Sequence, residues 1–289
     1  MKKWLLAFLT TACFLSCTPL DRKNPTDPAA SNYEGMHYIG SIGDFSGLGD
    51  FMVMGGYIWC VETSTDRIYK YNLSGDSGSY FINLNVHSPT GICNDGILFY
   101  VADSDAVVNN LKRFDPADMS NTQARLPFYQ SLAFIKCAAS PSYLFAATAT
   151  EVYRFDTAGN TMSVGVVYGD NLPGEALSTV SDIEYNAATG EVIVADSGAD
   201  RLIILSPDLT FIRDMVFTYD ITGFAVKGNI VYVPASDGIK KYYYDSGVVA
   251  GDFANYGEGY GMITAAGPCA VYGDYVLVGT GTAIKVFGP

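Results

Sequence analysis

The chain has 289 residues, of which 30 are Asp or Glu and 17 are Lys or Arg, so its formal net charge is −13 at pH 7. This acidity argues against a nucleic-acid partner, because binding to nucleic acid depends on Lys and Arg side chains that neutralise phosphate. It also argues against docking of the protein surface on anionic lipid, and it favours cationic partners.

The first 16 residues have the composition of a secretory signal peptide. Lys2 and Lys3 precede the apolar run "WLLAFLTTACFLS", which is too short to cross a bilayer hydrocarbon core of about 30 Å. Ser16 and Cys17 at its end resemble a bacterial lipobox, in which the cysteine becomes the new N-terminus and carries acyl chains. Cys13 is a second candidate for this role, and an ordinary secreted protein with a chance cysteine is the alternative.

Residues 17–35 are rich in Pro, Asn and Asp and have no apolar periodicity, which is typical of a flexible linker. As a coil, a segment of this length spans roughly 25 Å. We therefore expect a lipoprotein of the bacterial cell envelope whose membrane contact is the lipid on Cys17. Thr18, rather than Asp, follows that cysteine, which favours the outer membrane.

Residues 36–289 contain an internal repeat. "WCVETSTDRIYKY" at 59–71 aligns without a gap with "IVADSGADRLIIL" at 193–205. Weaker copies recur at intervals of 37–50 residues: "LKRF" at 111–114, "VYRF" at 152–155, "IKKY" at 239–242 and "IKVF" at 284–287. Apolar strand patterns precede each copy and a more polar one follows it, with Gly, Asp or Asn between them. Four strands per copy is the pattern of a propeller blade.

The repeat predicts an all-β chain that forms a six-bladed β-propeller with four-stranded antiparallel blades. The last copy reaches the end of the chain after its third strand, while an unmatched strand at 36–42 precedes the first complete copy. We predict that this N-terminal strand pairs with 284–287 and completes the last blade, which would close the ring and remove an exposed sheet edge.

The stretch "GEVIVADSGADRLIIL" at 190–205 resembles an NHL repeat, with matches at Val194, Ala195, Asp196, Ser197, Gly198 and Arg201. The first copy matches only at Glu62, Arg67 and Ile68, and the others only in strand pattern. The resemblance to NHL-like and YVTN-like propellers implies a fold. It does not imply a particular biochemical function, because proteins with such folds have many functions.

Acidic residues gather at the turns between the second and third strands, and one more begins an inner strand. They are Glu62, Asp103, Asp105, Asp196 and Asp237 at the turns, and Asp182 at the strand. One interpretation is a ring of carboxylates around the axial opening that binds a basic ligand or a metal ion. The other is that each carboxylate accepts hydrogen bonds from backbone amides of its own turn.

The sequence contains weaker signals for an enzyme than for a binding scaffold. Gluconolactonase-like propellers hold a divalent metal at their inner strands, where this chain offers only Asn94, Asp182 and Glu184. Amidating-lyase-like propellers use histidine clusters, and this chain has two histidines.

We expect a non-catalytic, monomeric scaffold without a cofactor that binds a protein, peptide or glycan. The alternative is a metal-dependent lactonase or hydrolase with a divalent cation in the axial channel.

The cysteines of the body, Cys60, Cys93, Cys137 and Cys269, form no C-x-x-C pair, which argues against a zinc site. A secreted protein meets oxidising conditions that permit disulfides, but these cysteines lie far apart in the sequence. We interpret them as small buried apolar residues.

Overall fold

The computed structural model describes residues 36–73, 80–82, 86–105, 111–119, 121–123, 132–156, 167–168, 176–235, 238–253, 263 and 265–289. Cys17, the expected tether and Asp237 lie outside these residues. The helical structure within them is one short 3-10 turn, η1 (Ser197–Ala199). Over the same ranges there is no helix with the length and apolarity that a membrane span requires.

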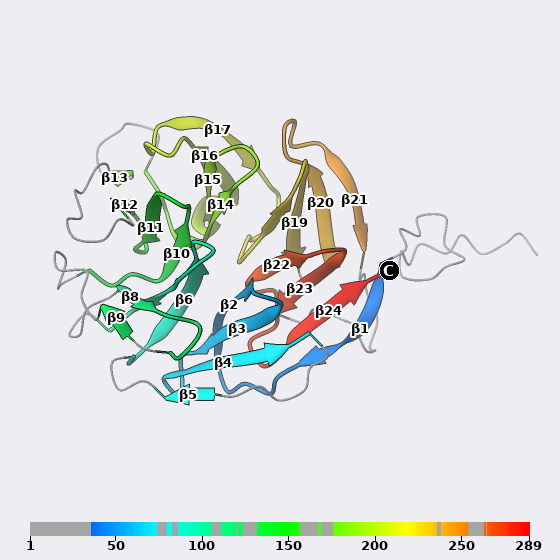
Figure 1. Ribbon diagram of the computed structural model, residues 1–289. Helices are drawn as coiled ribbons and strands as arrows, with labels where there is room; N and C mark the ends of the chain where they lie inside the picture. The colour runs from blue at the N-terminus through cyan, green and yellow to red at the C-terminus, as the bar shows by residue number, and fades with distance from the viewer. Residues whose placement is uncertain are drawn as a thin grey trace, which may run out of the picture.

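The described strands form six four-stranded antiparallel sheets. Five of them use strands that are consecutive in the chain: β2 (Leu48–Met54), β3 (Tyr57–Glu62), β4 (Arg67–Asn72) and β5 (Tyr80–Ile82); β6 (Pro89–Asn94), β7 (Phe99–Asp103), β8 (Leu111–Phe114) and β9 (Asn121–Gln123); β10 (Lys136–Ala139), β11 (Tyr143–Ala147), β12 (Val152–Asp156) and β13 (Val167–Tyr168); β14 (Val180–Asn186), β15 (Glu191–Asp196), β16 (Arg201–Leu205) and β17 (Phe211–Val216); and β18 (Ala225–Lys227), β19 (Ile230–Ala235), β20 (Gly238–Tyr243) and β21 (Val249–Phe253). The sheets stand around a common centre, with β2, β6, β10, β14 and β22 toward the middle (Figure 1). The expected all-β, propeller-like arrangement is confirmed.

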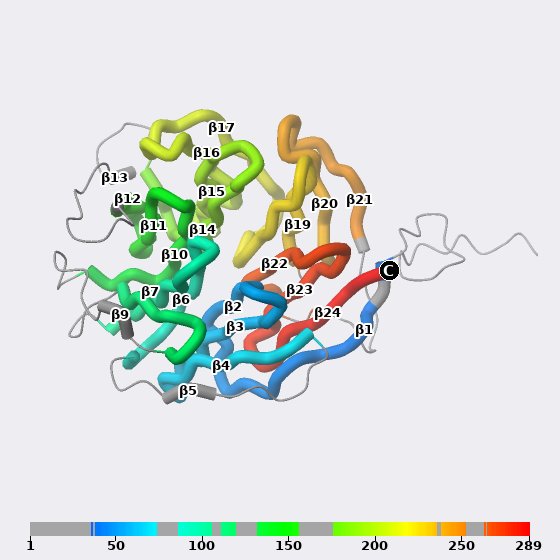
Figure 2. The backbone as a smooth tube through the Cα atoms, in the orientation of Figure 1, coloured from blue at the N-terminus to red at the C-terminus, as the bar shows by residue number. Residues whose placement is uncertain are grey.

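The remaining sheet joins the two ends of the described chain. It consists of β22 (Cys269–Tyr272), β23 (Tyr275–Gly279), β24 (Ile284–Gly288) and, beside β24, β1 (His37–Ile42). Ile42 pairs with Ile284 and Ser41 with Lys285, so this is the pairing that the sequence predicts. Figure 2 shows β1 in blue alongside β24 in red. Because β1 occupies the outer side of β24, that edge is paired rather than exposed.

The register of the sheets follows the sequence repeat. Ile68 in β4 pairs with Val61 in β3, and its repeat equivalent Leu202 in β16 pairs with Ala195 in β15. The turn before each of these third strands ends at an aspartate in the left-handed region, Asp66 with φ 57° and Asp200 with φ 50°. Asp tolerates this conformation better than most residues. The aligned letters therefore correspond to the same local structure.

The core lies between neighbouring sheets. The second strand of a sheet is covered on both faces, which explains its nearly continuous apolar sequence. In β15, for example, Val192, Val194 and Ala195 are fully buried. Between the first two sheets, Trp59 packs against Phe99 with ring centroids 5.1 Å apart. Each sheet therefore depends on both neighbours for its burial.

The closing strand supplies a matched test of ring closure. Ile42 is 3% exposed and packs in a cluster with Phe45 and Ile284, whereas Ile39 on the same strand is 50% exposed. We expect Ile42→Ala to lower the free energy of unfolding by about 2–4 kcal/mol and Ile39→Ala to change it by less than about 0.5 kcal/mol. Urea unfolding followed by tryptophan fluorescence measures both values. Equal effects of the two variants would contradict the role assigned to β1.

Candidate functional site

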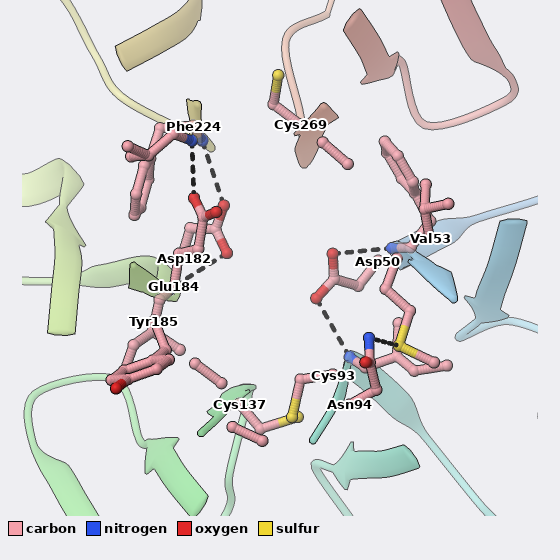
Figure 3. Close-up of a pocket in the computed structure, with 18 of the residues that line it drawn as sticks. Asp50, Val53, Cys93, Asn94, Cys137, Asp182, Glu184, Tyr185, Phe224 and Cys269 are labelled. Carbon is pink, nitrogen blue, oxygen red and sulfur yellow. Dashed lines mark hydrogen bonds between the residues drawn. The ribbon is translucent and has the colours of Figure 1, made fainter. Parts of the chain in front are cut away.

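A cavity of about 230 Å³ lies where the first strands of the sheets meet. Its lining includes the apolar residues Phe51, Met52, Ile92 and Phe224 together with three carboxylic acids. Asp182 and Glu184 lie together on one side, and Asp50 lies on the opposite side (Figure 3). The cavity therefore has acidic groups on two facing walls, with apolar residues between them.

Glycines allow the strands to approach one another beside this cavity. A Cβ atom on Gly91 would lie 2.8 Å from Cα of Lys136, and one on Gly223 would lie 2.3 Å from the carbonyl oxygen of Gly267. Both distances are shorter than a real contact allows. Any larger residue at these positions would push neighbouring sheets apart.

The Asp50 carboxylate forms a buried ion pair. Lys136 Nζ lies 3.1 Å from Asp50 Oδ2 and donates a hydrogen bond to the carbonyl oxygen of Gly49 at 3.2 Å. Asp50 also accepts the backbone N–H groups of Phe51 at 2.8 Å and Ile92 at 3.2 Å. Burial by itself lowers the pKa of Lys136, but the carboxylates of Asp50 and Asp182 outweigh burial and raise that pKa above its ordinary value. The ammonium group therefore stays charged, but burial of Asp50 outweighs this charge and raises the pKa of that carboxyl above its ordinary value as well.

The acidic pair on the opposite wall has backbone donors. Asp182 accepts the N–H groups of Ile183 at 2.9 Å and Phe224 at 3.2 Å, and Glu184 accepts that of Val226 at 3.1 Å. Burial raises the pKa of Asp182 to about 7, although the Lys136 charge opposes the rise. Burial and the adjacent Asp182 charge raise the pKa of Glu184 well above its ordinary value. Near neutral pH this wall retains protons that a bound cation could displace.

Three of the predicted turn acids bind backbone amides instead of facing the cavity. Glu62 accepts the N–H of Ser46 at 2.6 Å. Asp103 accepts those of His87 and Ser88, and Asp196 accepts those of Ser178 and Thr179, at 2.9–3.0 Å. Each carboxylate thus fixes the segment that leads into the first strand of its own sheet.

Side-chain partners complete these turns. Lys112 pairs with Asp103, and Arg201 Nε donates to Asp196 Oδ2 at 3.1 Å. The backbone N–H of Asp105 also donates to Asp103, at 3.1 Å. Of the predicted ligand-binding residues that the structure describes, Asp182 alone lines the cavity. Asn94 and Glu184, which the sequence offered as metal ligands, line it too.

Two residues at the cavity, Asp50 and Lys136, were not predicted from the sequence. Asp50 pairs with Val61 as Asp182 pairs with Ala195, and Lys136 pairs with Ala147 in the corresponding place. These three residues therefore occupy one register position in three sheets. Extending the repeat upstream into "LGDFMVM" and "FIKCAAS" would have revealed them.

The groups around this cavity do not fit a divalent metal ion. Within the described ranges, no three His, Cys, Asp or Glu side chains are disposed to hold one. The Lys136 ammonium already lies against Asp50. Its positive charge would repel a divalent cation bound nearby. The other oxygen-bearing side chains on the cavity wall that could bind a hard cation are those of Asn94, Asp182 and Glu184.

Comparison with known proteins identifies the fold alone. No family model and no curated protein sequence matches the chain. A solved structure described as "Crystal structure of Nidogen/Laminin Complex" superimposes with a TM-score of 0.61 at 14% sequence identity, over 76% of this chain and 93% of the other. At this identity the similarity shows a β-propeller-like fold and carries no information on ligands.

The raised pKa of Asp182 predicts a specific pH dependence. The folded state retains this proton up to about pH 7, whereas the unfolded chain loses it near the ordinary value of 3.8. The folded state therefore binds more protons between these values, and its stability falls as the pH rises through them. We expect Asp182→Asn to remove this component, whose slope is at most about 1.4 kcal/mol per pH unit.

Urea unfolding of both proteins at several pH values between 4 and 8 measures this difference. Asp274→Asn serves as the control, because its side chain is 82% exposed. Parallel stability curves for wild type and Asp182→Asn would show that Asp182 ionises normally.

Proposed function

We propose that this protein is a binding module of the bacterial cell envelope whose axial cavity holds the cationic group of a small organic ligand. The observation that carries the proposal is the Asp182–Glu184 wall, where a buried and a half-buried carboxylic acid face a cavity with backbone N–H groups as their described partners. A ligand cation would replace their protons and supply the opposite charge that Asp50 receives from Lys136.

The cavity walls favour an organic cation. Aromatic and apolar side chains surround the acids, including Phe51, Met52, Tyr185 and Phe224. An alkylammonium or guanidinium ion can place carbon atoms against such walls and its charge against the carboxylates. A volume of about 230 Å³ equals that of about eight water molecules in the liquid, so the bound group is small. The acidity of the whole chain would draw such cations toward the protein.

Titration with butylammonium, putrescine and methylguanidinium tests the proposal. We expect calorimetry to show binding that strengthens from pH 6 to pH 8, because the cation must displace protons from Asp182 and Glu184. The proton release makes the measured heat depend on the ionisation heat of the buffer. The double variant Asp182→Asn, Glu184→Gln should bind at least about tenfold more weakly, a loss of roughly 1.4 kcal/mol.

Asp274→Asn, which removes an exposed charge, should bind as the wild type does. The proposal is wrong if none of the three cations binds, or if binding strengthens as the pH falls.

We further propose that the six sheets are the blades of a closed six-bladed propeller built from NHL-like units. The shared register of Ile68, Val152 and Leu202 with their second strands supports this, as does the β1–β24 pairing. An acylated Cys17 followed by the tether at 17–35 would hold this body at the outer membrane. In this arrangement the ligand site is on the soluble body, and membrane contact is made by the lipid.

The anchor has its own test. In a bacterial host with the lipoprotein pathway, we expect the wild-type chain to incorporate labelled palmitate and to fractionate with membranes. Cys17→Ser should lose the label and leave the membrane fraction, whereas Cys13→Ser should behave as wild type. Normal acylation of Cys17→Ser would contradict the proposed lipid anchor. It would not contradict the proposed ligand site in the cavity.

A further inference from the structure

Two of the body cysteines come from neighbouring sheets and meet at the cavity wall. Cys93 lies on β6 and Cys137 on β10, and both line the cavity. Both are also nearly buried, at 8% and 4% exposed, in one apolar cluster with Tyr100, Phe134 and Leu144 between these two sheets. They are 44 residues apart in the sequence, so only the folding of the ring brings them together.

The register explains why the two side chains face each other. Cys93 is two residues beyond Gly91, as Glu184 is two residues beyond Asp182 in the equivalent strand. The Glu184 side chain reaches the next sheet, where it accepts the N–H of Val226, so Cys93 points toward β10 in the same way. Cys137 follows Lys136 directly, and successive strand residues point to opposite faces. Figure 3 shows the Cys93 and Cys137 side chains directed toward one another.

Both cysteines are free thiols in the structure, and burial together with the neighbouring Cys137 thiol raises the pKa of Cys93 well above its ordinary value. Cys137 Sγ also lies 3.7 Å from the carbonyl oxygen of Tyr100. The other two buried thiols belong to different clusters, Cys60 near β24 and Cys269 near β18. Among the four body cysteines, which are the ones the structure describes, Cys93 and Cys137 are thus the pair placed to bond.

We propose that Cys93 and Cys137 form a disulfide that joins the second and third sheets when the chain folds under oxidising conditions. The oxidant is a small-molecule disulfide such as oxidised glutathione. One cysteine thiolate attacks a sulfur of the small disulfide and releases one small thiol. The second cysteine thiolate then attacks the mixed disulfide and releases the other. Two electrons pass from the cysteine sulfurs to the small disulfide, and the two cysteine protons end on the released thiols.

The burial of these thiols determines when the bond forms. The thiolate is the reacting species, and burial disfavours it in the finished fold. The exchange therefore takes place during folding, before the two sheets close over the sulfurs. The proposed bond is independent of the proposed ligand, because the carboxylates of the cavity take no part in it.

Peptide mapping tests the proposal directly. Trypsin cleaves after Lys70, Lys112, Lys136 and Arg154, so Cys93 falls in the peptide 71–112 and Cys137 in the peptide 137–154, each as its only cysteine. The full chain is refolded with reduced and oxidised glutathione, alkylated in denaturant without reduction, and digested. We expect the two peptides to be recovered as one cross-linked species that reductant separates.

Variants control for unspecific oxidation. The double variant Cys60→Ala, Cys269→Ala should keep the cross-link, and Cys137→Ala should abolish it without creating another. Alkylation of Cys93 and Cys137 in the refolded wild type, or a cross-link from Cys93 to any other peptide, would overturn the proposal.

Thermal unfolding provides a second readout. The bond closes a long loop, so reductant should lower the Tm of the oxidised wild type by roughly 5–10 °C. Reductant should leave the Tm of the double variant Cys93→Ala, Cys137→Ala unchanged. An equal response of both proteins to reductant would also count against the bond.

Discussion

The backbone N–H groups of the innermost strands are the constraint on which the centre of this fold depends. The first strand of each sheet is an edge of that sheet, so some of its N–H groups have no strand to pair with. Buried near the axis without acceptors, they would destabilise the fold. Asp50 accepts the N–H of Ile92, and Asp182 accepts that of Phe224, each from the neighbouring sheet. The axial carboxylates therefore join adjacent sheets before they have any role toward a ligand.

The same carboxylates create the site because they are neutralised unequally. Asp50 has the Lys136 ammonium beside it, which compensates part of its charge, although burial still raises the pKa of this carboxyl above its ordinary value. Asp182 and Glu184 have backbone N–H donors, which stabilise an anion less than a full positive charge does. Burial then makes protonation the alternative to pairing, and the pKa of Asp182 rises to about 7. The axial acids thus include one pair whose described hydrogen-bond donors are backbone N–H groups, and this is the pair that we propose exchanges its protons for a cation.

The sequence was sufficient to predict an all-β, propeller-like fold and part of the candidate site. Strand alternation and the recurrence of residues such as Ile68 and Leu202 are local signals. The pairing of β1 with β24 followed from an unmatched strand at 36–42 and a last copy that lacked its fourth strand. The turn acids were ambiguous, because capping of a backbone and binding of a ligand both require an acid at a turn. Capping is distinguished from ligand binding only in the folded structure, where the backbone N–H groups of Ser46 and Ser178 donate hydrogen bonds to those acids. Lys136 was not predicted because its strand is short and lies in the most divergent part of the repeat.

The cavity also connects binding to stability. Below the pKa of Asp182 the folded protein holds that group neutral, and above it an anion remains buried with incomplete compensation. A cation that binds the folded state and not the unfolded chain would offset this cost, so its stabilising effect would grow with pH as its affinity does. Replacing Asp182 and Glu184 by neutral residues would remove the cost permanently but would also remove the attraction for a cation. The two acids therefore have two roles in this proposal: their oxygens accept the N–H groups of Phe224 and Val226, which apolar side chains could not do, and their charge would attract the cation.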